Sequence, residues 1–268
     1  MMDKAVFDAY RKLVYEQSGI AIKNGKESLV SARVQKRMRA LNIAGQREYL
    51  KYVQNDKTGN EMIHLLDVIS TNTTHFFREA DHFDFIQMAM KRWIEKGQTR
   101  FRHWCCASSS GEEPYTLAMI LSQLAEGHNL DQRILATDIS TTILERAQAG
   151  IYEEQKIGDI PKLLRQKYFD KRNTARGEAY QVKKSLRDMV LFKRLNLSKP
   201  PFPMKGPLDI VLCRNVMIYF DDDVRTALIN DVHRLLKPEG FLIVGKSEGL
   251  VRLDIPFKMV SPSIYMKK

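Results

Sequence analysis

Strand-like and helix-like segments alternate over the second half of the chain, and this pattern constrains the fold more than any other feature. Short apolar runs typical of buried strands occupy residues 102–107, 133–139, 189–195, 208–213 and 241–245. Segments with helical spacing follow three of these runs, at 112–125, 141–149 and 222–236. Such alternation predicts βαβ units and a mostly parallel sheet with helices on both faces. The last runs, 258–260 and 264–266, predict a closing hairpin.

The first 70 residues contain no strand-like alternation. Apolar positions recur at helical spacing in residues 3–16, and four apolar residues from Val30 to Leu41 form one stripe of a second helix. Two shorter helices are predicted at 48–53 and 60–69. We therefore expect three parts in this order: a small N-terminal all-α domain at 1–70, a linker at 71–82 and an α/β domain at 83–268.

The alternation lapses between residues 151 and 187, where the chain is basic and polar. A structureless loop of that length would be unusual inside a compact domain. We therefore predict an inserted β-subdomain at about 151–190, with a helix and a small antiparallel sheet. Its expected turn lies at 173–177, and its candidate strands are 179–183 and 190–193.

The net charge of +11 fits a nucleic acid, an anionic membrane or an acidic protein as partner, and composition alone does not choose among them. The distribution of the charge is more informative. No acidic residue occurs from Ser28 to Arg47, whereas five basic residues do: Arg33, Lys36, Arg37, Arg39 and Arg47. Most of these lie opposite the apolar stripe of the second helix, which therefore presents a basic face.

No apolar run reaches the ~20 residues of a membrane-spanning helix, and the N-terminus lacks the apolar core of a signal peptide. Cys105, Cys106 and Cys213 lie inside apolar runs, a spacing that suits neither disulfides nor a zinc site. We therefore expect buried free thiols, no metal, no membrane insertion and a cytoplasmic location.

The first candidate site is the run Ala-Ser-Ser-Ser-Gly-Glu-Glu-Pro-Tyr at 107–115, between the first strand and its helix. Small residues allow a ligand to approach the backbone closely. Glu112 and Glu113 at the helix N-terminus would repel a phosphate, whereas a cationic ligand such as S-adenosylmethionine is compatible with them. The alternative is an acidic first turn that only complements the helix dipole.

Two further strand ends carry candidate residues. Asp138 closes the second strand, where an acid can accept both hydroxyls of a ribose, although it could instead cap the next helix. The fourth strand ends in Arg214-Asn215, followed by Tyr219. Methyl donor and acceptor should meet at this strand end, and Tyr219 could face the sulfonium. The alternative for Tyr219 is a core tyrosine.

The segment 70–79 between the two domains is the fourth candidate. Five of its first six side chains are small hydroxyls or an amide, followed by His75, two phenylalanines, Arg78 and Glu79. A capped hinge would explain it equally well. His75 has no second histidine or cysteine nearby at metal-ligand spacing and is interpreted as an ordinary polar residue.

Taken together, these segments resemble the CheR family of chemotaxis receptor glutamate O-methyltransferases. The resemblance covers nearly the whole chain, and the residues that carry it are 71–79, 109–115, 136–139, 194–197, 213–220 and 236–240. It implies a class I S-adenosylmethionine-dependent methyltransferase fold, which is Rossmann-like, with an N-terminal helical domain and an inserted β-subdomain. The family commonly has Ala-Ser-Thr-Gly-Glu where this chain has Ser-Ser-Ser-Gly-Glu at 108–112, a change we expect to leave binding unaltered.

The resemblance also implies roles for individual residues. The residues implied to bind the methyl donor are Asn72, Thr74 and Arg78 in the linker, Glu112 at the amino end, Asp138 at the ribose, Asn196 and Leu197 near the adenine, and Arg214 and Asn215 near the methionine portion. Tyr219 would lie beside the reacting methyl group as the catalytic residue. Glu113 is the alternative to Glu112 as the residue that binds the amino end of the donor.

The implied reaction gives glutamyl methyl esters on the cytoplasmic helical bundles of chemoreceptors, for sensory adaptation, with S-adenosylhomocysteine as the second product. A glutamate with a pKa near 4.3 is already an anion at neutral pH, so no general base is needed. Four basic residues of the second helix would dock the acidic receptor surface: Arg33, Lys36, Arg37 and Arg39. We expect the enzyme to be a monomer.

Two other functions are compatible with parts of the sequence. A nucleic-acid methyltransferase would explain the basic charge, but it usually presents a base with an Asn/Asp-Pro-Pro-aromatic segment, where this chain has Asn-Val-Met-Ile-Tyr at 215–219. We therefore expect no nucleic acid partner. A non-catalytic domain that binds the methyl donor is the second alternative, and the intact set of motifs argues against it.

Overall fold

The computed structural model describes residues 2–70, 73–174, 177–250 and 257–268. The N-terminal domain contains the helices α1 (Lys4–Ser18), α2 (Glu27–Ala40), α3 (Gln46–Asn55) and α4 (Asn60–Ile69). The expected apolar stripe of α2 is buried at Val30, Val34 and Met38 against Tyr10 and Tyr49. All four helices expected from the periodicity are therefore confirmed.

A buried ion pair fastens α2 to α4 inside this domain. Arg37 Nε and Nη2 each donate to a carboxylate oxygen of Glu61 at 2.7 Å, and Tyr49 Oη donates to Glu61 Oε1 at 2.7 Å. Glu61 is 4% exposed, so its charge is compensated almost entirely by these two partners. The basic face of α2 thus has one arginine that turns inward.

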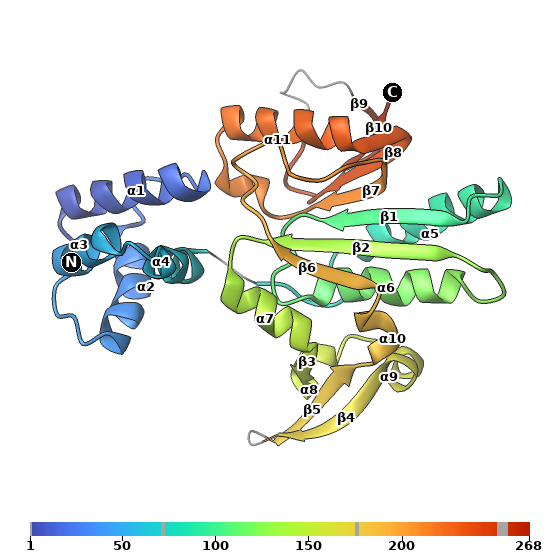
Figure 1. The fold of residues 1–268 in the computed structure, drawn as a ribbon, viewed down its shortest axis with the longest axis horizontal. Coiled ribbons are helices and arrows are strands. Elements are labelled where there is room, and N and C mark those ends of the chain that lie inside the picture. The colour runs from blue at the N-terminus through green and yellow to red at the C-terminus, as the bar shows by residue number, and fades with distance from the viewer. Residues whose placement is uncertain (1, 71–72, 175–176, 251–256) are drawn as a thin grey trace.

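The larger domain is built on a seven-stranded sheet (Figure 1). Its strands are β1 (Arg100–Cys105), β2 (Asp131–Asp138), β6 (Val190–Arg194), β7 (Leu208–Cys213), β8 (Leu236–Val244), β9 (Phe257–Ser261) and β10 (Ile264–Lys267). They lie in the order β6-β2-β1-β7-β8-β10-β9, with β10 antiparallel to β8 and β9, and the other pairs parallel. The predicted Rossmann-like, mostly parallel sheet and its closing hairpin are confirmed.

Helices cover both faces of the sheet. They are α5 (Ala80–Glu95), α6 (Glu112–Leu124), α7 (Thr141–Ala149) and α11 (Asp222–Leu235). Phe101 and Cys105 of β1 pack with α5 and α6, whereas Trp104 and the adjoining Cys106 pack with α11 on the other face. This alternation follows from the period of two in a strand. All three cysteines are buried and free, as expected.

The inserted subdomain contains β3 (Ile151–Glu153), α8 (Glu154–Ile157), α9 (Lys162–Tyr168), β4 (Phe169–Thr174), β5 (Gly177–Val182) and α10 (Lys184–Arg187). Its antiparallel sheet has the order β3-β5-β4. The candidate strand 190–193 was wrongly placed in it, because Val190–Arg194 pairs in parallel with β2 in the main sheet. The expected turn joins Thr174 to Gly177, which pair with each other, and its tip at 175–176 lies outside the described residues.

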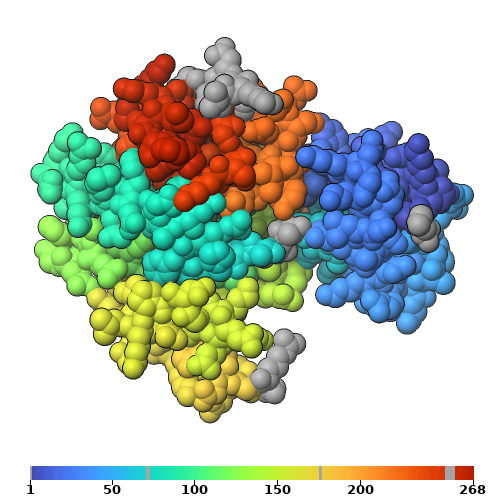
Figure 2. All heavy atoms as spheres, turned by 180° about the vertical axis from the view of Figure 1, so that it is seen from behind, coloured from blue at the N-terminus to red at the C-terminus, as the bar shows by residue number. Residues whose placement is uncertain are grey.

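The N-terminal domain lies against the edge of the sheet toward which β1 and β2 point, and the insert extends from another side (Figures 1 and 2). Three hydrogen bonds join the end of α1 to the sheet domain. Tyr15 Oη donates to Asp221 Oδ2 (2.5 Å), Asn196 Nδ2 to Gln17 O (2.8 Å) and Ala21 N to Tyr219 O (2.8 Å). The residues of the candidate motifs therefore face the helical domain.

Candidate functional site

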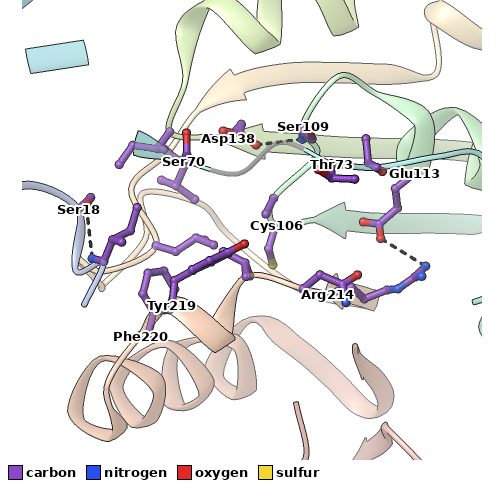
Figure 3. Close-up of a pocket in the computed structure, with 18 of the residues that line it drawn as sticks. Ser18, Ser70, Thr73, Cys106, Ser109, Glu113, Asp138, Arg214, Tyr219 and Phe220 are labelled. Atoms are coloured by element: carbon purple, nitrogen blue, oxygen red, sulfur yellow. Dashed lines mark hydrogen bonds and ion pairs between the residues drawn. The ribbon is translucent and has the colours of Figure 1, made fainter. Parts of the chain in front are cut away.

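A cleft lies where the carboxyl ends of β1, β2 and β7 meet the N-terminal domain (Figure 3). The space between its walls is about 1020 Å³, a volume that includes open solvent at its mouth. The sheet order reverses direction at β1, which has β2 on one side and β7 on the other. Ligands of open α/β sheets bind at such a switch point.

The loop after β1 supplies one wall of the cleft through Cys106, Ala107 and Ser109. Ser109 has a positive φ of 47° and donates its N–H to Asp138 Oδ2 at 2.9 Å. Gly111, with φ 98°, could not carry a side chain, because a Cβ there would lie 2.8 Å from Tyr152 Oη. Tyr152 Oη instead donates to Ser110 O at 2.7 Å, so the inserted subdomain holds this loop in place.

The two glutamates that follow the loop point in different directions, as consecutive residues on a helix must. Glu113 lines the cleft, and its Oε2 lies 3.3 Å from Arg214 Nη1. Glu112 is fully buried behind the loop, where Ser110 Oγ donates to its Oε2 (2.6 Å) and Lys156 Nζ lies 3.6 Å from its Oε1. Burial raises the pKa of Glu113 to about 7, although the charge of Arg214 opposes the shift.

Asp138 occupies the end of β2, as the sequence predicts, and lines the cleft. Its Oδ2 accepts from Ser109 N and its Oδ1 accepts from Ser140 N at 3.1 Å. Burial raises the pKa of Asp138, and these hydrogen bonds oppose the shift. The N-cap of α7 is Ser140, whose hydroxyl accepts from Ile143 N, so the capping role belongs to Ser140.

Arg214 follows β7 and is almost completely buried at the other end of the cleft. Its Nη2 donates to the backbone oxygen of Arg78 and lies 3.2 Å from Glu79 Oε2, which ties the linker to the sheet. Nη1 of Arg214 forms the ion pair with Glu113, and Nε has no hydrogen-bond partner among the described residues. A buried donor without a partner favours an acceptor group of a ligand at this end of the cleft.

Asn215 and Tyr219 also line the cleft. Asn215 has a positive φ of 58°, and Tyr219 ends a 3-10 turn at Met217–Tyr219. Figure 3 shows Tyr219 across the cleft from Asp138 and Ser109. Tyr219 therefore lines the cleft and is not a core tyrosine.

The remaining predicted donor residues also gather here. Thr74 and Arg78 line the cleft from the linker, and Asn196 and Leu197 line it beside the N-terminal domain. Asn72 lies outside the described residues. Several other cleft residues were not predicted. Ser18, Ile20, Ile69 and Phe83 lie outside every sequence motif and reach the cleft through tertiary packing that leaves no local pattern, whereas His75 lies in a motif but was interpreted as an ordinary polar residue.

The four basic residues predicted to dock the substrate do not form one uniform patch on α2. Lys36 and Arg39 are exposed. Arg33 is half-buried and donates to the backbone oxygens of Ile69 and Ser70. Arg37 is paired with Glu61 as described above. Their positions therefore favour Lys36 and Arg39 as the residues accessible to a partner.

Within residues 2–70, 73–174, 177–250 and 257–268, no group of three or more His, Cys, Asp and Glu side chains is arranged to hold a metal ion. In the same part of the chain, no helix combines the length and apolar character needed to cross a bilayer.

The chain matches two protein-family models along almost its entire length. Residues 5–70 match the CheR methyltransferase all-alpha domain, and residues 72–266 match the CheR methyltransferase SAM binding domain. A chemotaxis protein methyltransferase from Borreliella burgdorferi is 37% identical over 96% of this chain and 92% of its own. A chemotaxis protein methyltransferase from Escherichia coli is 31% identical over 98% of this chain and 91% of its own.

Among solved structures, an S-adenosylmethionine dependent methyltransferase from Mesorhizobium loti aligns with 54% of this chain and 45% of its own, at 17% identity and a TM-score of 0.29, too low for further inference. The family models and the two relatives confirm the expected family, fold and use of S-adenosylmethionine by a methyltransferase. The chain thus belongs to the CheR methyltransferase family.

Proposed function

We propose that this enzyme transfers a methyl group from S-adenosylmethionine to glutamate side chains of chemoreceptor cytoplasmic bundles, giving glutamyl methyl esters for sensory adaptation. The observation that supports this best is the cleft, which is lined by Asp138, Glu113 and Arg214 and also by Tyr219. These side chains provide the anionic and cationic groups that a donor with hydroxyl, ammonium and carboxylate groups requires. The relatives named above are chemotaxis protein methyltransferases.

When bound, the donor supplies a methyl group made electrophilic by its sulfonium. We assign the ribose hydroxyls to Asp138 and the adenine side to Asn196 and Leu197. The ammonium group is assigned to Glu113 in place of Glu112, because Glu113 lines the cleft and Glu112 is enclosed behind it. Arg214 and Asn215 would hold the carboxylate end, where Nε of the buried guanidinium has no hydrogen-bond partner among the described residues. Thr74 and Arg78 would cover the donor from the linker.

The acceptor carboxylate is ionised at neutral pH, so the enzyme needs no base to activate it. The protein would act by positioning the carboxylate in line with the methyl group, which can contribute roughly 7–11 kcal/mol in well-oriented reactions. Tyr219 would flank the reacting methyl group and orient it. Exclusion of water from the closed cleft would favour the attack of an anion on a cation.

A second cavity offers a route for the acceptor. It meets the donor cleft at Ile20, Ile69 and Tyr219, and its rim carries Lys23 and Lys26. An acidic receptor helix that approaches from this side would place its glutamate next to Tyr219. The exposed Lys36 and Arg39 of α2 would then attract the same acidic surface, mainly by raising the encounter rate. We expect the enzyme to act as a cytoplasmic monomer.

The test is transfer of radiolabelled methyl from S-adenosylmethionine to purified receptor cytoplasmic fragments, with bulk RNA and DNA as parallel acceptors. Base-labile label on the receptor would identify a carboxyl methyl ester and support the proposal. Label on nucleic acid alone would refute the proposal and would indicate that the basic surfaces bind nucleic acid. Binding of the donor without transfer to any acceptor would favour a non-catalytic sensor.

A further inference from the structure

Glu248 is a buried carboxylate behind the cleft, outside its lining and outside every motif considered above. It is only 2% exposed and follows β8 by four residues. It accepts hydrogen bonds from three backbone N–H groups. Its Oε2 accepts from Asn215 N and from Gly245 N (2.8 Å), and its Oε1 accepts from Ile218 N (3.2 Å). Two of these donors belong to the loop that carries Asn215 and Tyr219 into the cleft.

That loop turns sharply at its start. Asn215 has a φ of 58°, in the left-handed region that asparagine adopts more readily than most residues with a side chain, and the 3-10 turn follows directly. Hydrogen bonds from N–H groups to a carboxylate are roughly twice as strong as neutral ones. A carboxylate that accepts from both Asn215 and Ile218 therefore fixes the loop at its start and in the middle of the turn.

Gly245 provides the space for this arrangement. A Cβ at this position would lie 2.6 Å from Glu248 Oε2 and 2.6 Å from Asn215 Nδ2. Any side chain at residue 245 would push aside either the carboxylate or the asparagine. We call Glu248 and Gly245 together the carboxylate clamp.

We propose that Glu248 is a positioning residue for methyl transfer, which acts through Asn215 and Ile218 to place Tyr219 beside the reacting methyl group. The inference rests on the proposed function for the identity of the acceptor. The clamp holds Asn215, one of the two residues that we assign to the carboxylate end of the donor, but its hydrogen bonds do not involve Asp138, Asn196 or Leu197, to which we assign the ribose and adenine portions. Loss of the clamp should therefore reduce the rate of transfer more than the affinity for the donor.

Two variants test the clamp independently. Glu248→Gln replaces one acceptor oxygen with an NH₂ group that opposes the backbone donors, while Gly245→Ala keeps the carboxylate but removes its space. We expect kcat toward receptor fragments to fall at least about tenfold in both variants, which corresponds to a rise of about 1.4 kcal/mol in the activation barrier. The Kd for S-adenosylhomocysteine, measured by calorimetry, should stay within about threefold.

Asp231→Asn is the matched control. Asp231 is also a buried carboxylate that accepts a backbone N–H, from Phe202 at 2.7 Å, but it lies outside the cleft lining. This variant should lower the melting temperature and keep kcat within about twofold of wild type. If Glu248→Gln and Gly245→Ala behave in the same way, Glu248 supports only the fold and the proposal is wrong. A tenfold loss of donor affinity in both clamp variants would also overturn it.

Hydrogen exchange gives a readout that does not depend on the acceptor. Amides in residues 214–219 should exchange faster in both clamp variants than in wild type and in Asp231→Asn. Unchanged exchange would show that the clamp does not hold the loop. If wild-type enzyme methylates no receptor fragment, the proposed function fails, and the exchange rates still decide whether Glu248 positions this loop.

Discussion

Arg214 Nη1 lies 3.3 Å from Glu113 Oε2, and their side chains are only 1% and 13% exposed. Burial raises the pKa of Glu113 to about 7, and the neighbouring carboxylates Glu79 and Glu248 add to the increase, whereas Arg214 opposes it. Glu113 therefore changes charge near neutral pH while it faces the cleft. A ligand with an ammonium group at this position would favour the ionised form.

The affinity for the donor should consequently depend on pH through Glu113. Below pH 7 the free enzyme holds this carboxyl protonated, and a cationic ligand must first displace the proton. We expect the affinity for S-adenosylhomocysteine to be constant above pH 7. Below pH 7 it should decrease, with a limiting slope of about tenfold for each pH unit. Calorimetry between about pH 5.5 and 8.5 would measure this. Glu113→Gln should abolish the dependence and weaken binding at pH 8 by roughly tenfold or more.

Glu112→Gln is the control for this prediction. Glu112 lies behind the loop and contacts Ser110 and Lys156, so its substitution should leave the pH dependence in place. If Glu112→Gln flattens the profile and Glu113→Gln does not, the donor ligand is Glu112, as the resemblance alone implied.

Tyr219 should contribute to the rate without being essential. The acceptor carboxylate needs no deprotonation, so the phenol has no proton to transfer, and its loss removes only an orienting contact. We expect Tyr219→Phe to lower kcat less than about tenfold and to leave the Kd for S-adenosylhomocysteine unchanged. Steady-state kinetics with a receptor fragment would measure both effects. Abolished turnover with intact donor binding would assign the hydroxyl a chemical role.

Local periodicity was sufficient to predict most of the elements. The stripe from Val30 to Met38 and the alternation along β1 both show which side chains are buried, and both patterns depend only on residues close in the sequence. The parallel sheet then placed Asp138 and Arg214 at one edge, since the carboxyl ends of parallel strands lie together. The main features of the cleft could therefore be predicted before its geometry was known.

Partners distant in the sequence could not be predicted in this way. Val190–Arg194 has the pattern of a strand in either sheet, and only its pairing with β2 decides between them. Nothing in the pattern of α2 shows that Arg37 turns inward, because its partner Glu61 lies 24 residues away in the sequence. Glu112 and Glu113 differ by one step along α6. Ser110 and Lys156 contact Glu112 behind the loop, whereas Arg214, about 100 residues away in the sequence, contacts Glu113 in the cleft.

The ion pair between Arg37 and Glu61 should stabilise the fold, whereas the neighbouring Lys36 should act in substrate docking. Arg37→Ala would leave Glu61 buried without its charge partner, and we expect a loss of about 3 kcal/mol in the free energy of unfolding. Lys36→Ala, on the exposed face of the same helix, should change stability by less than about 0.5 kcal/mol and raise the KM for receptor fragments at low salt. Urea unfolding and initial rates would distinguish these outcomes. Equal stabilities of the two variants would contradict the structural role of Arg37.

His103 should make the fold sensitive to mild acid. It is buried in β1, where desolvation lowers its pKa to about 4, and neither ring nitrogen has a hydrogen-bond partner among the described residues. In the unfolded chain the imidazole binds a proton near pH 6.5. Between pH 6.5 and 4 the unfolded state therefore binds more protons than the folded state, so the folded state loses stability as the pH falls.

The stabilising contribution of neutral His103 is fully present above pH 6.5, and about 3 kcal/mol of it should be lost on acidification to pH 4. His103→Gln cannot titrate and should show a smaller decrease over the same range, although carboxylates titrate in both proteins. Urea unfolding at about pH 7, 5.5 and 4.5 would measure the difference between the two decreases. If wild type and His103→Gln lose the same free energy of unfolding, His103 is already protonated in the folded state.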